Sequence, residues 1–543
     1  MARDRAADLE RLRSVQTLAR GGQHAEAAAL AEEARADGLE HPLLYNVLAL
    51  RLEREGRLPE AEALLQSAVK LAPADVASRN ALGLCLLRLE RPDEALVHFD
   101  SALASESRLP FLHANRGTAL VALRRVRDAQ ASFERALALD ESQGVALAGL
   151  AKIASSRGAF PEARARAEKT LQLMPGYPEA VLSLVSCDLG ERKPSLAESR
   201  ARDFLAREDL DPLSRAYALG LLGDALDAQD RTDEAFSAYL TCNRALRAAH
   251  GPRFGSEPGA RAYALGLIDF LRRADAGAWR TVPLSSGVRD PASGHVFVLG
   301  FPRSGTTLLE VVLEGHPQVV SLEEHESLMD GIREFMRQPA DLDRLLRAPP
   351  ATLDALRESY WRRVASAGID VRGKVFVDKN PLNTLKLPLI ARLFPQARIL
   401  VACRDPRDVV LSCFRHRFRM SAPFYELLTL EGAAAYYDAV MRVLVECMRA
   451  LPLNTRLVRH EDVVAAFTPE MRRICNFLQL DWLPAMEDFA SRAQRREILT
   501  PSAAQLARGL NASGVGYWRR YRTQLAPVLP LLSGWVNYFH FDA

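Results

Sequence analysis

The segment His295-Val-Phe-Val-Leu-Gly-Phe-Pro-Arg-Ser-Gly-Thr-Thr307 decides the fold of the C-terminal half of this chain. Residues 296–299 are β-branched, aromatic or aliphatic and lie between two glycines, a pattern that predicts a buried parallel strand. Apolar residues then recur with helical spacing over 308–313 and predict a helix packed on that strand. The intervening Gly300-x4-Gly305-Thr-Thr has the spacing of a P-loop, whose backbone N–H groups and helix N-terminus bind phosphate.

One position of this loop differs from nucleotide triphosphatases. Those enzymes need a lysine where Thr306 stands, because its ammonium reaches the β- and γ-phosphates. The cation here is Arg303, inside the loop, and a planar guanidinium binds a pair of phosphate or sulfonate oxygens. Ser304, Thr306 and Thr307 add hydroxyl donors. The loop therefore fits a two-unit anhydride better than a triphosphate.

A second segment, about a hundred residues further on, has the same organisation. Residues 398–403 predict another buried strand, followed by Arg404-Asp-Pro-Arg-Asp408 and a helix over 409–418. Arg404 lies at the end of the predicted strand, and Ser412 lies about two turns into the next helix. We expect both side chains to face one anion at the carboxyl edge of a parallel sheet. Asp405 and Pro406 are typical residues of a helix start.

The loop 302–307 resembles the 5′-phosphosulfate loop of sulfotransferases that use 3′-phosphoadenosine 5′-phosphosulfate (PAPS). The likeness extends to protein-tyrosine sulfotransferases and to bacterial sulfotransferases with tetratricopeptide repeats. It implies PAPS as co-substrate, no metal ion, and a 3′-phosphate site at Arg404 and Ser412. The residues that it assigns to the 5′-phosphosulfate are Pro302, Arg303, Ser304, Gly305, Thr306 and Thr307.

Sulfuryl transfer needs a base for the acceptor's proton and cations for the transferring group and the leaving phosphate, as phosphoryl transfer does. In the tyrosine sulfotransferases that this chain resembles, the base is a Glu whose offset from the loop arginine falls on Glu324. The neighbouring His325 is the alternative base. Residues 374–378 predict a strand that delivers Lys379 beside the leaving oxygen, a role the resemblance also implies. Arg303 joins Glu324 and Lys379 as a predicted catalytic residue.

Near the end of the chain, residues 498–502 and 513–521 resemble the family's closing loop over the nucleotide. On this resemblance we expect Ser502 and either Arg519 or Arg520 to contact phosphates; a plain amphipathic helix with a basic face is the alternative for 517–521. The chain also departs from the family, because Arg459-His460-Glu461 replaces a more usual Tyr-Glu. These differences affect the cap of the nucleotide site more than the chemistry.

The N-terminal half carries an internal repeat of small residues. Alanines recur every 34 residues at 27, 61, 95, 129 and 163, and Gly83 and Gly117 keep the same step. This is the period of tetratricopeptide repeats, in which paired helices meet at a small residue. We predict an all-α repeat solenoid over 1–250, a helical linker over 251–289, and an α/β P-loop-like sulfotransferase domain with a parallel sheet over 290–543. Such an array holds a protein or peptide in its groove, and that ligand is a candidate acceptor.

Composition limits the remaining choices. The 543 residues are 48% hydrophobic and 26% charged, which is typical of globular domains, and a net charge of +3 argues against nucleic-acid binding. The first residues are charged, and no apolar run is long enough to span a membrane, so we expect a cytoplasmic protein. Seven cysteines without paired or metal-binding spacing predict reduced thiols and no structural zinc. Oligomerisation is left open.

The sequence thus predicts a PAPS-dependent sulfotransferase acting on a hydroxyl acceptor, with peptidyl tyrosine as one candidate. A glycan, a lipid or a small molecule would use the same chemistry. Two other functions stay open: a P-loop kinase or nucleotide hydrolase, and a repeat-based scaffold that binds a nucleotide without turnover.

Overall fold

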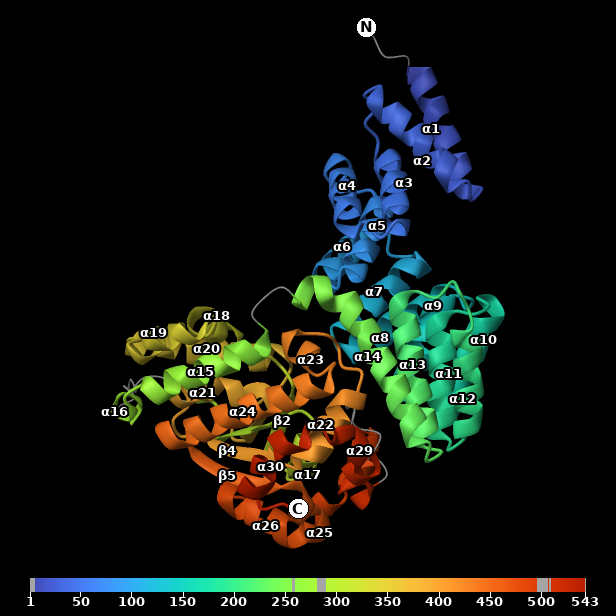
Figure 1. The fold of residues 1–543 in the computed structure, drawn as a ribbon. Helices are drawn as coiled ribbons and strands as arrows, with labels where there is room; N and C mark the ends of the chain where they lie inside the picture. Colours follow the sequence, from blue (N-terminus) through green and yellow to red (C-terminus); the bar gives the residue numbers. More distant parts are fainter. Residues whose placement is uncertain (1–4, 256–258, 281–289, 496–505, 507–508, 543) are drawn as a thin grey trace. The chain divides into compact units, whose positions relative to one another are not determined.

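The computed structural model describes residues 5–255, 259–280, 290–495, 506 and 509–542. These residues form two compact units, which divide between Glu191 and Arg192. Figure 1 colours the chain from blue at the N-terminus to red at the C-terminus.

The first unit is built of successive antiparallel helix pairs (Figure 1). Its helices are α1 (Arg5–Arg20), α2 (His24–Ala36), α3 (Pro42–Arg54), α4 (Leu58–Leu71), α5 (Val76–Arg88), α6 (Pro92–Ser105), α7 (Pro110–Ala122), α8 (Val126–Leu139), α9 (Gly144–Ser156), α10 (Phe160–Leu173) and α11 (Pro178–Gly190). Most are short for isolated helices, so their stability comes from packing on the next helix. The predicted all-α repeat array is confirmed.

The 34-residue period has a steric cause. The alanines at 27, 61, 95, 129 and 163 are all fully buried. A Cβ atom added to Gly83 would lie 2.5 Å from the Phe99 ring, and one added to Gly117 would lie 2.5 Å from the Phe133 ring. These two repeats therefore close by setting an aromatic ring of one helix against the bare backbone of its partner.

The second unit begins with helices and continues into a sheet. Its first helices are α12 (Pro194–Leu205), α13 (Pro212–Asp227), α14 (Thr232–Phe254), α15 (Ala260–Arg273) and α16 (Ala276–Arg280). The unit starts at 192, inside the predicted repeat array, and α14 packs against the helices at 406–415 and 422–426 of the same unit. The proposed domain boundaries near 250 and 290 stay predictions.

The sheet has five parallel strands in the order β2-β3-β1-β4-β5 (Figure 1). They are β1 (Gly294–Gly300), β2 (Val319–Glu323), β3 (Val375–Lys379), β4 (Arg398–Cys403) and β5 (Asn454–Arg459). The chain leaves β1 toward one edge and leaves the adjacent β4 toward the other. Ligands of open α/β sheets bind at the carboxyl ends of strands where the strand order reverses in this way. The predicted parallel α/β domain is confirmed.

Alternate residues of the central strand face two different layers of helices. Val296 and Val298 pack with α17 (Thr306–Leu313), α25 (His460–Ala465) and α26 (Phe467–Leu478). His295 and Phe297 face an aromatic cluster from α20 (Pro350–Ser366) and the end of α21 (Leu387–Leu393).

The other helices of this unit lie between or after the strands. They are α18 (Met329–Phe335), α19 (Leu342–Leu346), α22 (Pro406–Arg415), α23 (Ala422–Glu426), α24 (Leu430–Ala450), α27 (Phe489–Arg495), α29 (Arg522–Leu525) and α30 (Leu529–Tyr538), with short 3₁₀ turns at 339–341, 381–386, 484–487, 512–514 and 517–521. Within the described residues, every helix is too short or too polar to cross a bilayer.

Candidate active site

The turn between β1 and α17 is held in unusual backbone conformations. Gly305, just before the helix, has φ +102°, and Arg303 has φ +71°, a left-handed value that non-glycine residues seldom adopt. Strained residues of this kind cluster at functional sites, where surrounding structure holds them in place. The turn therefore presents the N-terminus of α17 in a fixed position, which favours an anion.

The predicted second turn, after β4, meets this loop. The Arg303 Nε donates a hydrogen bond to the Ser412 Oγ at 2.9 Å, and the Arg404 Nη1 donates to the Arg303 carbonyl oxygen at 3.3 Å. The structure thus brings together the predicted 5′- and 3′-phosphate residues. Burial and the nearby charge of Arg404 lower the pKa of Arg303 to about 10. Two guanidiniums held this close favour a bound anion, because an anion offsets their repulsion.

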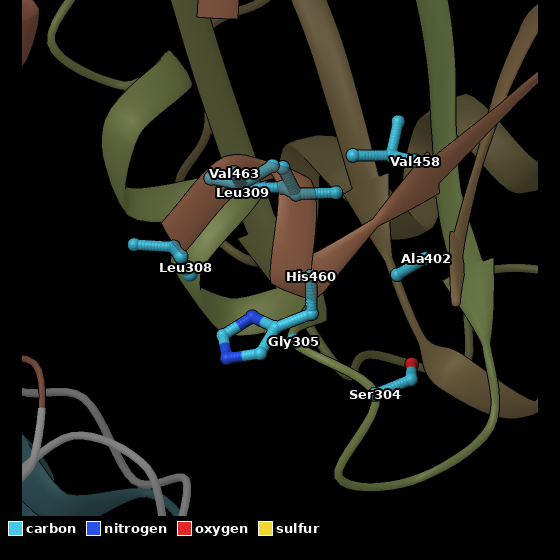
Figure 2. A pocket seen from close by; sticks show the side chains of 8 residues that line it. All are labelled: Ser304, Gly305, Leu308, Leu309, Ala402, Val458, His460 and Val463. Carbon is cyan, nitrogen blue, oxygen red and sulfur yellow. The ribbon is translucent and has the colours of Figure 1, made fainter. Parts of the chain in front are cut away.

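His460 lies against the same loop, as Figure 2 shows. A Cβ atom on Gly305 would sit 2.9 Å from the His460 Nδ1, so this approach requires glycine. A small cavity of about 10 Å³ lies between them, and Ser304 lines it. The buried Ser304 Oγ has no hydrogen-bond partner among the residues that the structure describes. A buried hydroxyl without a partner is costly, and an oxygen of a bound anion would satisfy it.

His460 entered the sequence analysis only as a departure from the family pattern. Burial, followed by the charges of Arg404 and Arg303, lowers the pKa of His460 to about 3, so the ring is neutral near pH 7. A neutral imidazole beside the phosphate loop offers one donor and one acceptor. Its place after a strand that ends at the same edge of the sheet was the available sequence signal.

Lys379 lies at the centre of a group of carboxylates. Its side chain is fully buried, and its Nζ is 3.0 Å from the Glu324 Oε1, 3.4 Å from the Glu323 Oε1 and 3.5 Å from the Glu310 Oε2. Burial alone lowers the pKa of Lys379, but attraction to Glu310, Glu324 and Glu323 outweighs it, so the net pKa is raised. The ammonium is therefore kept protonated beside the predicted base.

The backbone also joins the two predicted catalytic residues. The Glu324 N–H donates to the Lys379 carbonyl oxygen at 2.7 Å, and Glu324 has φ +44°. The sheet register places Glu323 opposite Lys379, so both carboxylates follow the end of β2 next to the end of β3. The alternative base His325 follows directly, and its Nδ1 lies 3.2 Å from the Ser327 Oγ. Burial lowers the pKa of His325.

Sequence reasoning missed Glu310. It is fully buried on α17, and the Ser321 Oγ donates to its Oε1 at 2.8 Å. The signal was a single acid within the apolar run 308–313, on a helix predicted to be covered by the sheet. A buried carboxylate of this kind requires a cation, and Lys379 supplies it.

The predicted closing segment reaches the site through its backbone. The Arg404 Nη2 donates to the Gly514 carbonyl oxygen at 2.5 Å, and the Asp408 carboxylate accepts from the Gly516 and Trp518 N–H groups, each at 2.7 Å. The Arg519 guanidinium lies over the Trp518 ring and lines a separate cavity of about 370 Å³. Ser502 lies outside the described residues. Contacts of Ser502 and Arg519 with a nucleotide stay predictions.

Metal ligands and thiols complete the chemical inventory. Over the described ranges, no group of three or more His, Cys, Asp or Glu side chains is arranged to hold a metal ion. All seven cysteines are buried thiols. Cys413 lies beside the loop, where its Sγ donates to the Pro302 carbonyl oxygen at 3.4 Å.

Comparison with known proteins gives matches to both parts of the chain. Residues 295–484 match the sequence profile of the sulfotransferase family, and residues 12–76, 46–108 and 115–178 match that of the tetratricopeptide repeat. An uncharacterized protein of Aquifex aeolicus is 25% identical over 259 residues, which cover 45% of this chain and 32% of that protein. Protein-tyrosine sulfotransferase A of Caenorhabditis elegans is 25% identical over 216 residues, covering 39% of this chain and 53% of that enzyme.

The chain therefore spans between a third and about half of the length of these two relatives. Among solved structures, a tetratricopeptide repeat protein from Parabacteroides merdae aligns with 44% of this chain and 93% of its own, at 17% identity and a TM-score of 0.35.

Proposed function

Residues 295–484 form a domain of the sulfotransferase family, and we propose that the protein transfers a sulfuryl group from PAPS to a hydroxyl acceptor. The observation that carries this proposal is the meeting of the two strand-to-helix turns, at the hydrogen bond between Arg303 and Ser412. A donor with phosphate groups at both its 5′ and 3′ positions needs two anion sites at one edge of the sheet, and these turns supply them.

The residues at the loop fit such a donor. The Ser304 hydroxyl, the N-terminus of α17 and the Arg303 guanidinium would hold the 5′-phosphosulfate, with Thr306 and Thr307 adding hydroxyl donors. Arg404 would hold the 3′-phosphate. Ser412 would join it, because accepting from Arg303 leaves the serine's own hydroxyl hydrogen to donate.

The group around Lys379 supports the chemistry of transfer. The acceptor oxygen bonds to the donor's sulfur while the bond from sulfur to the phosphate oxygen breaks. Glu324 takes the proton of the acceptor hydroxyl, and its Oε1 lies 3.0 Å from the Lys379 Nζ. The ammonium of Lys379 stabilises the negative charge on the departing oxygen. Glu310 and Glu323 retain Lys379 when Glu324 turns toward the acceptor.

We further propose a tyrosine side chain of a protein as the acceptor. Two observations support it: relatives of this chain include protein-tyrosine sulfotransferases, and the repeat array belongs to a class that binds extended peptides. In this proposal the array presents the acceptor protein to the catalytic domain.

Titration calorimetry with 3′-phosphoadenosine 5′-phosphate (PAP) tests the donor assignment. We expect metal-independent binding that weakens about tenfold to a hundredfold in Arg303→Ala and Arg404→Ala, the usual loss of a charged hydrogen bond. Arg473→Ala, which removes an exposed arginine on α26, is the matched control. A preference for Mg²⁺-ATP would favour the kinase or hydrolase alternative instead.

Glu324→Gln tests the base separately from binding. The variant should bind PAP as the wild type does and transfer sulfate to a tyrosine peptide about 10²–10⁴-fold more slowly. If the wild type binds PAP and transfers nothing to peptides, glycans or phenols, the scaffold alternative is favoured.

A further inference from the structure

One buried carboxylate, that of Asp227, lies where the hairpin of α13 and α14 contacts α22 and the segment 517–521. Asp227, the last residue of α13, has a side chain that is 8% exposed and forms an ion pair with Arg415 at the end of α22. It also accepts hydrogen bonds from the Tyr517 hydroxyl at 2.5 Å and the Tyr521 hydroxyl at 2.7 Å. The Arg520 Nη1 lies 3.2 Å from the Asp227 Oδ1 as well, so four groups from two distant parts of the sequence meet on one side chain.

Arg415 is enclosed by aromatic rings as well as paired. Its guanidinium carbon lies 5.1 Å from the Tyr239 ring centre, 5.0 Å from that of Tyr517 and 5.5 Å from that of Tyr521. A cation stacked on aromatic faces and paired with a buried carboxylate has little freedom to move. Arg415 therefore fixes the C-terminal turn of α22 against α14 and the segment 517–521.

A second set of contacts holds the same turn. The Arg417 Nη2 is 2.6 Å from the Asp224 Oδ2, and the Asn243 Nδ2 donates to the Phe414 carbonyl oxygen at 2.8 Å. The rings of Phe236 and Phe414 are stacked 5.2 Å apart. The hairpin thus contacts α22 through charge, backbone and aromatic packing.

Both elements that meet at Asp227 lead directly into the anion site. Ser412, which accepts the hydrogen bond from Arg303, lies one helical turn before Arg415 on α22. Gly514, whose carbonyl oxygen binds Arg404, lies three residues before Tyr517. Asp227 consequently contacts both of the segments that hold Arg303 and Arg404 in place.

We propose that Asp227 is a positioning residue of the donor site, so that the last helical hairpin before the catalytic domain is part of the machinery that binds the nucleotide. This inference rests on the proposed function. It predicts that loss of the Asp227 charge releases α22 and 517–521 from each other and weakens binding of the donor, without any contact between Asp227 and the nucleotide.

The test compares PAP binding by full-length wild type, Asp227→Asn and Asp188→Asn. Asp188 is the matched control, because its buried carboxylate pairs with Arg164 at 2.7 Å within the first unit. We expect PAP to bind about tenfold or more weakly to Asp227→Asn and unchanged to Asp188→Asn. Equal PAP affinity in wild type and Asp227→Asn would overturn the inference, and so would an equal loss in both variants.

Two further outcomes are separated by design. If Asp227→Asn does not fold, Tyr517→Phe replaces it in the test, because this change removes one hydroxyl from Asp227 and keeps the ring. The PAP affinity of Tyr517→Phe should then fall several-fold. A PAP affinity equal to that of the wild type would overturn the inference. If the wild type itself fails to bind PAP, the proposed function fails and this inference falls with it, whereas a binding wild type with an indifferent Asp227→Asn refutes only the inference.

Discussion

Replacing Lys379 with methionine should cost the catalytic unit about 3–5 kcal/mol of unfolding free energy, because it leaves a buried carboxylate without its cation. Glu310 is fully buried, whereas the Glu323 and Glu324 side chains are 14% and 24% exposed and can turn to water. The penalty therefore comes from Glu310.

A second variant separates stability from chemistry. Lys379→Met combined with Glu310→Gln removes both charges, and replacing both members of a buried pair is often neutral. The double variant should recover most of the lost stability and none of the sulfuryl-transfer activity. Lys386→Met is the control, since this more exposed lysine pairs with Glu326, and exposed pairs contribute about 0–1 kcal/mol.

Urea unfolding followed by tryptophan fluorescence is a suitable assay. All five tryptophans lie at or after position 279, so the signal reports on the second unit alone. An unchanged midpoint in Lys379→Met would refute the claim that this lysine compensates Glu310. The same claim would be refuted if the double variant Lys379→Met and Glu310→Gln unfolded at the same low midpoint as Lys379→Met alone.

Three further predictions concern single positions. Ser304→Ala should keep or raise the wild-type urea midpoint, because it removes a hydroxyl that is buried without a partner among the described residues, yet weaken PAP binding about tenfold by calorimetry. Gly117→Leu should push against the Phe133 ring and cost the repeat unit about 1–3 kcal/mol, seen as a lower midpoint by circular dichroism and not by tryptophan fluorescence. Burial raises the pKa of Asp378 to about 7, so between about pH 4 and 7 the folded protein holds a proton that the unfolded chain has lost. In urea titrations, the wild type should therefore lose stability relative to Asp378→Asn as the pH rises from about 4 to 7. Parallel pH profiles of the two proteins would contradict this.

The parts of the fold that short-range patterns determine were predictable. The alanine period follows from helix contacts within one repeat, and the strand ending at Gly300 is an unbroken apolar run. A common edge for the two turns was also predictable, because the carboxyl ends of adjacent parallel strands lie at one edge of the sheet. The partner of Ser412 was not, since the sequence pairs it with Arg404 and the structure gives it a hydrogen bond from Arg303.

Contacts between residues far apart in the chain were not predictable in the same way. Asp227 and Tyr521 are almost three hundred positions apart, and each alone has the appearance of an ordinary surface residue of a helix. The position of Arg519 over Trp518 depends on how the closing segment packs, which local composition does not specify. Glu310 is the single charged residue of the run 308–313, and the helix was predicted from the apolar residues of that run alone.

The pairing of β2 with β3 has a consequence for how such a protein diversifies. The distance between Glu324 and Lys379 depends on strand register and on one backbone hydrogen bond, not on the loops that follow. A slip of one residue would turn every side chain of a strand to the opposite face, so selection against such slips is strong. Loops and repeats around the site can therefore change in length and sequence without moving Glu324 away from Lys379, which we propose as the reacting pair.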